Sequence, residues 1–349
     1  MAYDFNSHDL STRVRKFIED YNAEVDRYRR AEENNLNVDD FVRYDKIKWS
    51  ASLKANLSRG RCAVFSNTSI RQSCYRPFTK KYIYFDEMLV ERRYKLPKIL
   101  PNTETENENR VICCTNHLQT PFVVQIVNRI PNEAIGGRQG QCFPFYVYDD
   151  GANRRENITD WALEHFRKHC GKKKITKWDI FYYVYGILHH PGYRERYADN
   201  LKRELPRIPL APDFAAFAKA GSELAGLHLD YEKLEPWPLK WIESPDLPLS
   251  YRVEKMRLSK DKMSLTVNES LALAGIPPET FRYRLGNRSA LDWVIDQYRI
   301  TENKRSGIRS DPNRPDDEEY IVRLVGQVVR VSVETVKIVE HLPTDFGGA

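Results

Sequence analysis

The chain has 349 residues, of which 41% are hydrophobic, 12% aromatic and 30% charged. This length and composition allow two domains, or one large domain with a helical appendage, with substantial hydrophobic cores. Its net charge of +6 permits a polyanionic partner without requiring one, since a strongly basic non-specific binder would carry a larger excess of Lys and Arg. No apolar run approaches the roughly 18 residues that span a bilayer, and the N-terminal sequence MAYDFNSHDLSTRVRK lacks the apolar core of a signal peptide, so we expect a cytoplasmic protein.

Residues 9–31 predict an amphipathic helix, because apolar side chains recur near a period of 3.6 residues while the opposite face carries Arg, Lys, Glu and Asp. The polar sequence ENNLN (33–37) breaks the pattern. We interpret this helix as a packing element of a helical lead-in over residues 1–60, in preference to a direct contact with DNA.

Residues 61–152 have the character of a β-rich part. The short β-branched or aromatic runs, separated by turn residues, are RCAVF, KKYIYFD, NRVICCT, PFVVQIV and CFPFYVY. The sequence PNTETENEN (101–109) is polar and turn-like. GGRQGQ (136–141) predicts a glycine-rich loop between two strands.

Residues 153–349 predict a mainly helical part. Thr176 and Asp179 form a capping pattern for a helix that Pro191 ends, and further helices are expected over 193–205 and 213–229. The Pro-rich stretch 234–249 indicates an extended connector.

Further along the same part, residues 250–268 predict a β-hairpin. Its alternating pattern suits either a ribbon in the DNA major groove or a hairpin that covers a core, and we favour the second. Ser289 and Asp292 cap another helix, 304–317 is an Arg-rich loop, and a last helix runs over 318–341. The fold class is therefore α+β: an N-terminal helix, a mixed or antiparallel β-rich recognition part, and a helical part with a small hairpin.

The cysteines provide no metal-binding pattern. None of the six forms C-x-x-C, and strand alternation would point Cys113 and Cys114 to opposite faces, whereas zinc needs ligands that converge. We expect reduced thiols and no bound metal.

Recognition of DNA would need cations for phosphates and Arg, Gln or Asn for base edges, carried on loops and strand ends. The loop 136–141 holds guanine-type and adenine-type readers close together. The candidates for DNA contact are Arg59, Arg61, Lys80, Lys81, Arg92, Arg93, Asn116, His117, Gln119, Arg138, Gln139, Gln141, Lys172, Lys173, Arg305 and Arg309.

Each candidate also has a structural interpretation. Paired cations are usually solvated faces, and polar loop tips are often plain connections. The aromatic run Tyr182–Tyr185 is better explained by packing than by base stacking, and His189 and His190 by structural roles than by hydrolysis. Glu302 and Lys304 have nuclease-like spacing, but their position at a helix end leading into a loop argues against catalysis.

Several long segments resemble the C-terminal specificity region of type ISP restriction-modification enzymes, an adenine-N6 DNA methyltransferase family. In chain order they include CYRPFTKKYIYFDEMLVERRYKLPKIL (74–100), NITDWAL, ITKWDIFYYVYGILHHPGYRERYADNLKRELPRIPL (175–210), AFAKAGSELAGLHLDYE, YRVEKMRLSKDKMSL, SALDWVIDQYRITENKRSGIRSDPN and VSVETVKIVEHLP. Such enzymes join a nuclease, a helicase-like ATPase, a methyltransferase and a target-recognition domain in one chain.

The resemblance implies a target-recognition domain that holds an asymmetric double-stranded DNA site for methylation or restriction by methyltransferase and ATPase domains outside this chain. S-adenosylmethionine, ATP and Mg would belong to the parent enzyme, and no cofactor is expected here. This agrees with the absence of an Asn-Pro-Pro-Tyr-type tetrapeptide, of a glycine-rich loop in a strand–loop–helix setting, and of G-x-x-x-x-G-K-[ST]. The alternatives are a docking module of the same enzyme and a free-standing DNA-binding protein of phage defence.

Overall fold

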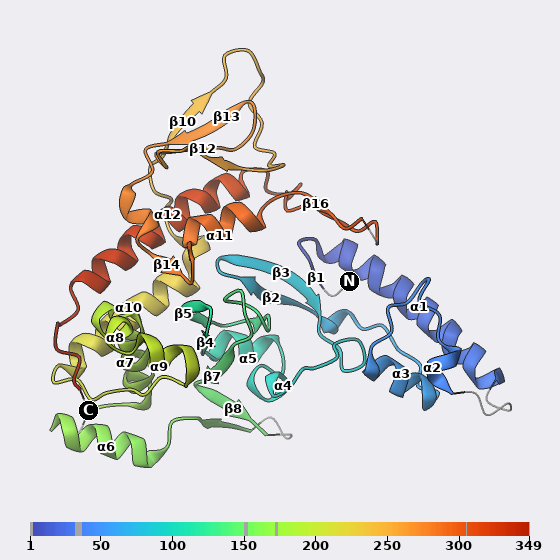
Figure 1. Cartoon of the computed structure of the whole chain (residues 1–349), viewed down its shortest axis with the longest axis horizontal. Coiled ribbons are helices and arrows are strands. Elements are labelled where there is room, and N and C mark those ends of the chain that lie inside the picture. The colour runs from blue at the N-terminus through green and yellow to red at the C-terminus, as the bar shows by residue number, and fades with distance from the viewer. Residues whose placement is uncertain (1–2, 32–36, 150–152, 172–173, 305, 349) are drawn as a thin grey trace. The chain divides into compact units, whose positions relative to one another are not determined.

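The computed structural model describes residues 3–31, 37–149, 153–171, 174–304 and 306–348 (Figure 1). The chain forms two compact units, Met1–Ser73 with Lys80–Pro97, and Cys74–Thr79 with Lys98–Ala349. Helices and several small sheets make up an α+β fold, which confirms the fold class expected from the sequence. Within the described ranges, none of the helices has both the length and the apolar character needed to cross a membrane.

The first unit is built around α1 (Ser7–Ala31), the amphipathic helix that the sequence predicts. Its buried face, which includes Leu10 and Tyr21, packs on Trp49 and on Leu57 of α3. The other elements of this unit are α2 (Val38–Phe41), α3 (Ala51–Ser58), β1 (Tyr3–Asp4), a 3-10 turn (Asn67–Ser69), the first part of β2 (Ile70–Arg76) and most of β3 (Thr79–Tyr84). β1 pairs antiparallel with β3.

The strand expected over residues 61–65 is not formed. Side chains of α1 form hydrogen bonds with the backbone groups that a neighbouring strand would otherwise bond. The Tyr21 hydroxyl donates to the Arg61 carbonyl (3.0 Å). Asn22 accepts from the Ala63 N–H (2.8 Å) and donates to its carbonyl (2.9 Å). The segment therefore belongs to no sheet.

The core of the second unit contains a three-stranded sheet in the order β5-β4-β7. Antiparallel pairing places Cys113 of β4 opposite Gln125 of β5 on one side and Cys142 of β7 on the other. The strands here are β4 (Val111–His117), β5 (Thr120–Val127), β6 (Ile130–Pro131), β7 (Gln141–Pro144), β8 (Tyr146–Tyr148) and β9 (Arg154–Glu156). The strands expected over 109–115, 121–127 and 142–148 are thus confirmed, the first beginning at Val111 and the last as two short strands.

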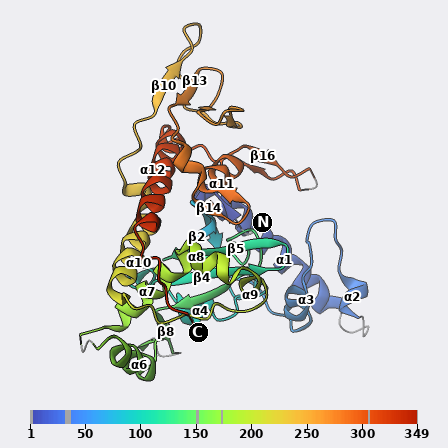
Figure 2. The same cartoon turned by 60° about the vertical axis from the view of Figure 1, so that its left-hand side comes forward.

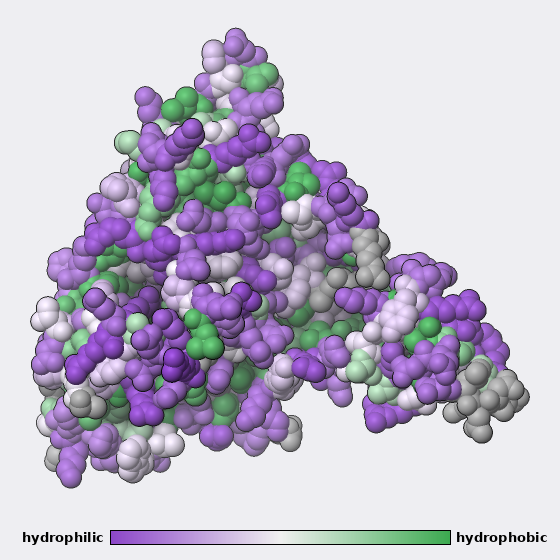
Figure 3. All heavy atoms as spheres, in the orientation of Figure 1, coloured by the Kyte–Doolittle hydropathy of each residue, from purple (hydrophilic) through white to green (hydrophobic). Residues whose placement is uncertain are grey.

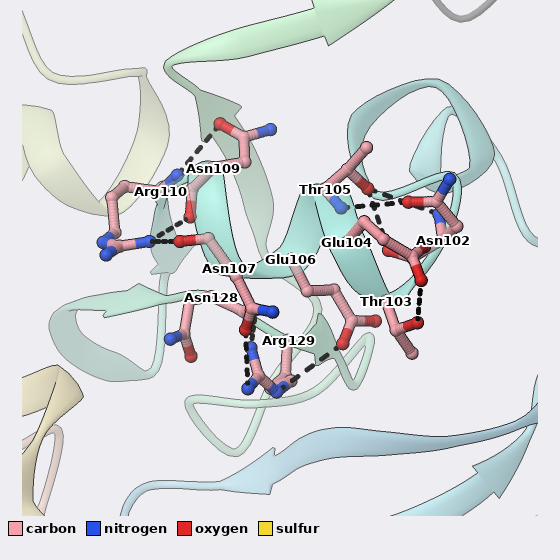
Figure 4. A network of polar contacts seen from close by, with 10 residues as sticks. All are labelled: Asn102, Thr103, Glu104, Thr105, Glu106, Asn107, Asn109, Arg110, Asn128 and Arg129. Atoms are coloured by element: carbon pink, nitrogen blue, oxygen red, sulfur yellow. Dashed lines mark hydrogen bonds and ion pairs between the residues drawn. The ribbon is translucent and has the colours of Figure 1, made fainter.

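The polar stretch 101–109 is a helix rather than a turn. α4 (Leu96–Ile99) precedes it, and α5 (Thr103–Glu108) begins at Asn102, whose side chain accepts from the Thr105 N–H at 2.9 Å. Glu106 is buried and lies 3.5 Å from Arg129, which follows β5 (Figure 4). The capping residue and this distant cation together stabilise a helix that composition alone does not indicate.

The helical layer is made by α7 (Lys177–His189) and α10 (Phe214–Leu229), which pack closely through Gly186 and Gly221. α6 (Asp160–Cys170), α11 (Ala290–Gln297) and α12 (Tyr320–Glu340) also lie in the second unit. The predicted capping pairs of α7 and α11 are present as reciprocal hydrogen bonds.

The single helix expected over 193–205 is two helices, α8 (Pro191–Arg196) and α9 (Ala198–Arg203), separated at Tyr197. Pro191 ends α7 but also begins α8, because proline suits the first turn of a helix. The His190 ring accepts from the Tyr193 N–H at 3.1 Å and caps the new helix.

A four-stranded sheet in the order β10-β13-β12-β11 lies further along the chain. The expected hairpin is present as β11 (Arg257–Leu258) and β12 (Ser264–Thr266), with Val253 and Met256 buried, as a hairpin covering a core requires. The expected connector supplies β10 (Lys240–Glu243), which pairs with β13 (Leu271–Ala274). Smaller elements are the 3-10 turns Tyr231–Lys233 and Pro278–Phe281 and the hairpins β14 (Arg284–Leu285) with β15 (Arg288–Ser289) and β16 (Thr301–Glu302) with β17 (Arg309–Ser310).

The turn between β2 and β3 places an aromatic side chain in the core of the second unit. Phe78 has a φ of 53°, a conformation that non-glycine residues seldom adopt. Its buried ring makes edge-on contacts with Tyr231 (5.2 Å between centroids), Tyr283 (6.3 Å) and His228 (6.4 Å). Burial of this ring offsets the cost of the unusual backbone conformation.

His228 is the polar centre of this aromatic cluster. Its Nδ1 lies 2.7 Å from the Tyr185 hydroxyl and its Nε2 3.0 Å from Thr335 Oγ1. Burial, reinforced by the Arg194 guanidinium, lowers the pKa of His228 to about 3. The imidazole is therefore neutral in the folded protein at ordinary pH.

The contact between α7 and α10 predicts opposite effects for two glycines of one helix. A Cβ atom on Gly221 would lie 1.8 Å from the Tyr182 carbonyl oxygen, so Gly221→Ala should destabilise the fold by about 3 kcal/mol or more. Gly226 has no such neighbour within 4 Å, so Gly226→Ala should stabilise the protein by roughly 0.5–1 kcal/mol. Urea unfolding measures both, and equal effects of the two substitutions would contradict this packing.

Protonation of His228 should contribute to unfolding in acid. The stabilisation from its neutral form is complete above the ordinary pKa of 6.5 and is lost as the pH falls from 6.5 towards 3, because the unfolded chain takes up the proton first. In His228→Gln the slope of unfolding free energy against pH in this window should fall by up to about 1.4 kcal/mol per pH unit. Unfolding in urea at a series of pH values tests this, and parallel slopes for both proteins would refute it.

Candidate nucleic-acid interface

Polar loops meet at one end of the β5-β4-β7 sheet, which we call the loop end. It comprises the β4–β5 turn (117–119) and the loop 136–141. Because β7 runs antiparallel to β4, its first residue, Gln141, pairs with Cys114 near the end of β4. Cβ atoms on Gly136 and Gly140 would lie 2.6 and 3.1 Å from Thr115 Oγ1, so the glycine loop lies directly against the strand that leads into the turn.

The loop 136–141 is ordered by its own backbone. The Gly137 N–H donates to the Ala134 carbonyl (2.8 Å) and the Gly140 N–H to the Glu133 carbonyl (3.1 Å). The exposed residues of this loop include Arg138, Gln139 and Gln141, and their side chains form no hydrogen bond or ion pair among the described residues. The structure thus holds three potential base-reading groups on a fixed backbone.

A tryptophan from α11 supports this loop. Gly137 has a φ of 88°, and a Cβ atom there would lie 3.1 Å from Trp293 Cη2. The Trp293 indole N–H donates to the Leu285 carbonyl (3.0 Å), and the Arg288 guanidinium lies 5.0 Å from the ring centroid. α11 therefore supports the loop 136–141 from behind.

The β4–β5 turn lies beside a cationic helix end that sequence reasoning missed. α9 is next to β4 and β5 in both views (Figures 1 and 2). A groove of about 710 Å³ is lined by His117, Leu118 and Gln119 together with Lys202 and Arg203 of α9. The two cations lie in the last turn of a short helix, a place where basic residues are common, so no local signal marks them.

Candidates in the first unit lie in a different setting. Arg59, Arg61 and Arg93 line a cleft of about 880 Å³, but three carboxylates, Asp86, Glu87 and Glu91, line it too. Arg93 lies 3.3 Å from Glu87. Cations and carboxylates thus alternate in the cleft, which makes it a less favourable surface for a phosphate backbone than the loop end.

The remaining candidates are dispersed. Lys80 and Lys81 are half-buried on β3, and Lys81 lies 4.3 Å from the ring centroid of Phe5. Arg92 is exposed. Arg309 lies on β17, 3.9 Å from Asp311. Lys172, Lys173, Arg305 and the side chain of Asn116 lie outside the described residues.

Two of the histidines lie in the core of the second unit. His189 and His228 are buried and burial lowers the pKa of both, so they belong to the core. Among the described residues, no three His, Cys, Asp or Glu side chains converge in a way that could hold a metal ion. The chemistry at the loop end is that of hydrogen-bond donors, acceptors and cations, which suits binding.

Comparison with known proteins yields a family and several similar structures. A model described as the type ISP C-terminal specificity domain matches residues 1–324. A nuclease-deletion mutant of the type ISP enzyme LlaGI, in complex with a DNA substrate mimic, is 33% identical with a TM-score of 0.86, covering 100% of this chain and 32% of that chain.

Two other DNA complexes are similar to the chain over nearly its whole length. DrdV bound to DNA is 35% identical with a TM-score of 0.87, covering 99% of this chain and 35% of that one. LlaBIII, an ATP-dependent type ISP enzyme bound to DNA, is 28% identical with a TM-score of 0.86, covering 99% and 23%. The chain thus spans about a third or less of these enzymes. No curated protein matches it significantly.

The support of the loop 136–141 by Trp293 is testable. Trp293→Phe shortens the side chain, so that its ring no longer reaches Gly137, and it removes the donor to Leu285, whose loss alone should cost about 1 kcal/mol. Hydrogen exchange at the Gly137 and Gly140 amides should become several-fold faster, while exchange in α7 is unchanged. Equal acceleration in both places would mean that Trp293 supports the whole core and not the loop in particular.

Proposed function

The chain belongs to the type ISP C-terminal specificity domains, and on this premise we propose that it recognises a specific sequence in double-stranded DNA through the loop end of its β5-β4-β7 sheet. The observation that carries the proposal is the convergence there of Arg138, Gln139 and Gln141 with the β4–β5 turn. Three similar structures contain bound DNA or a DNA substrate mimic, which supports DNA as the ligand.

The residue types at the loop end match the edges of bases. The fork of Arg138 can meet guanine O6 and N7 together, and the amides of Gln139 and Gln141 can meet adenine N6 and N7. A fixed backbone reduces the entropy lost when such side chains bind. Cations outside the loop end, among them Lys80, Arg92 and Arg309, would add contacts to phosphates, which position the duplex but do not read its sequence.

We assign bond-making to other domains of a parent restriction-modification enzyme. On this proposal, adenine-N6 methylation with S-adenosylmethionine and ATP- and Mg-dependent restriction are carried out by methyltransferase, helicase-like ATPase and nuclease domains. This chain presents the site to them. We also retain the boundaries expected from the sequence for the recognition part, residues 61–152, which contain the loop end.

A second function, docking on another domain, is favoured by the β10-β13-β12-β11 sheet. β10 is an edge strand, and Trp241 (41%), Ile242 (48%) and nearby Met263 (61%) are well exposed. Figure 3 shows hydrophobic side chains on the surface at the upper end, where Figure 1 places β10 and β13. Exposed apolar groups on a strand edge are typical of protein contacts.

Selection of duplexes from a randomised library of about 30 base pairs, long enough to cover a specific interface, tests the DNA-reading function. Single substitutions Arg138→Ala, Gln139→Ala and Gln141→Ala should each relax the preference at one position, since a bidentate contact contributes about 1–3 kcal/mol of discrimination. Arg207→Ala removes a side chain that is 90% exposed and far along the chain from the loop, so it serves as the control. An unchanged preference in all three variants would rule out reading by this loop.

A further inference from the structure

The β4–β5 turn exposes a leucine between two polar residues. Leu118 is 66% exposed, and it lines the groove shared with α9. The turn is ordered locally, because the Gln119 N–H donates to His117 Nδ1 at 3.1 Å. The Leu118 side chain is therefore displayed at a defined place, where covering it on binding would be favourable.

The base of this turn is rigid. Thr115 and Val123 are paired across the strands and buried, and the register shifts between Thr115 and His117, so the tip bends away from the regular ladder. Beyond Cys114 only β4 and β5 remain paired, and a two-stranded ribbon has the dimensions to enter the major groove of DNA.

Two cations flank the same groove. Lys202 lies 3.0 Å from Asp199 and remains 38% exposed, while Arg203 is exposed and forms no ion pair among the described residues. A duplex that received the tip in its major groove would bring a phosphate strand towards such cations. The groove thus combines one apolar contact, one amide and a positive border.

We propose that the β4–β5 turn reads one A·T base pair: the Gln119 amide binds adenine N6 and N7, and Leu118 contacts the 5-methyl group of the paired thymine. Lys202 and Arg203 hold a neighbouring phosphate. The inference rests on the proposed DNA-reading function and adds a specificity-determining residue to it. In the major groove the thymine methyl is the apolar feature that marks an A·T pair, and adenine is the base that an amide side chain binds in two places.

The test uses the whole chain and the duplex that the wild-type protein enriches from the randomised library, with each thymine replaced in turn by uracil, which lacks only the methyl group. At one position the replacement should weaken binding by about fourfold, the effect of removing one buried methyl group. The ratio of the affinities for the thymine and uracil duplexes should fall to about one in Leu118→Ala. Leu118→Met, which keeps an apolar side chain, should retain most of this thymine-over-uracil ratio.

The cations have a separate readout. Lys202→Gln with Arg203→Gln should lower the slope of log affinity against log salt by about 0.9, the value for the one phosphate that the two cations hold, and leave the thymine-over-uracil ratio intact. An unchanged slope would remove the two side chains from the interface and overturn that part of the proposal.

The outcomes separate this inference from the function on which it rests. If the wild-type chain enriches no sequence, the DNA-reading function fails and the inference fails with it. If it enriches a sequence but no uracil replacement has an effect, or Leu118→Ala keeps the ratio, only the inference is overturned. A fluorescence rise of 2-aminopurine in the bound duplex, absent with Leu118→Ala, would indicate insertion between bases and would also overturn methyl reading.

Discussion

The loop end exists because β4 is buried between two antiparallel partners. Residues Val111–Thr115 are buried along their whole length, so strand register is set by core packing, since a slip of one residue would exchange the two faces. That register brings the end of β4, the start of β5 and the start of β7 to the same place. Polar residues separated by about twenty positions in the sequence thereby become one surface.

Behind the sheet lies a core that combines aromatic rings with neutral polar groups. Arg194 is a cation within this core. Its Nε donates to the Leu188 carbonyl (2.6 Å), and its burial lowers the pKa of the guanidinium. Placing a cation there is costly, and its field favours the neutral form of His189 and His228. Together with the close contact of α7 and α10, this core forms the tightly packed base of the loop end.

Placement of charge matters more in this protein than its amount. A net charge of +6 over 349 residues produces no strong general field, and several cations are paired with carboxylates nearby, as Arg93 is with Glu87. Exposed pairs of this kind contribute little to stability, but they reduce non-specific attraction for DNA. On the proposed function, the unpaired side chains of Arg138, Gln139 and Gln141 would make the selective contacts, and affinity would depend on the fit of base edges as well as on phosphate neutralisation.

Local chemistry explains what the sequence alone determined. Some features can be predicted from residues that are neighbours in the sequence. They are the 3.6-residue period of α1, the reciprocal caps of α7 and α11, the glycine loop 136–141 and the family resemblance. Tertiary contacts decided the rest. Asn22 keeps residues 61–65 out of a sheet, and Arg129 anchors the helix within 101–109. α9 brings Lys202 and Arg203 to the β4–β5 turn. Each of these depends on partners distant in the chain, whose approach is set by packing and leaves no periodic trace in the sequence.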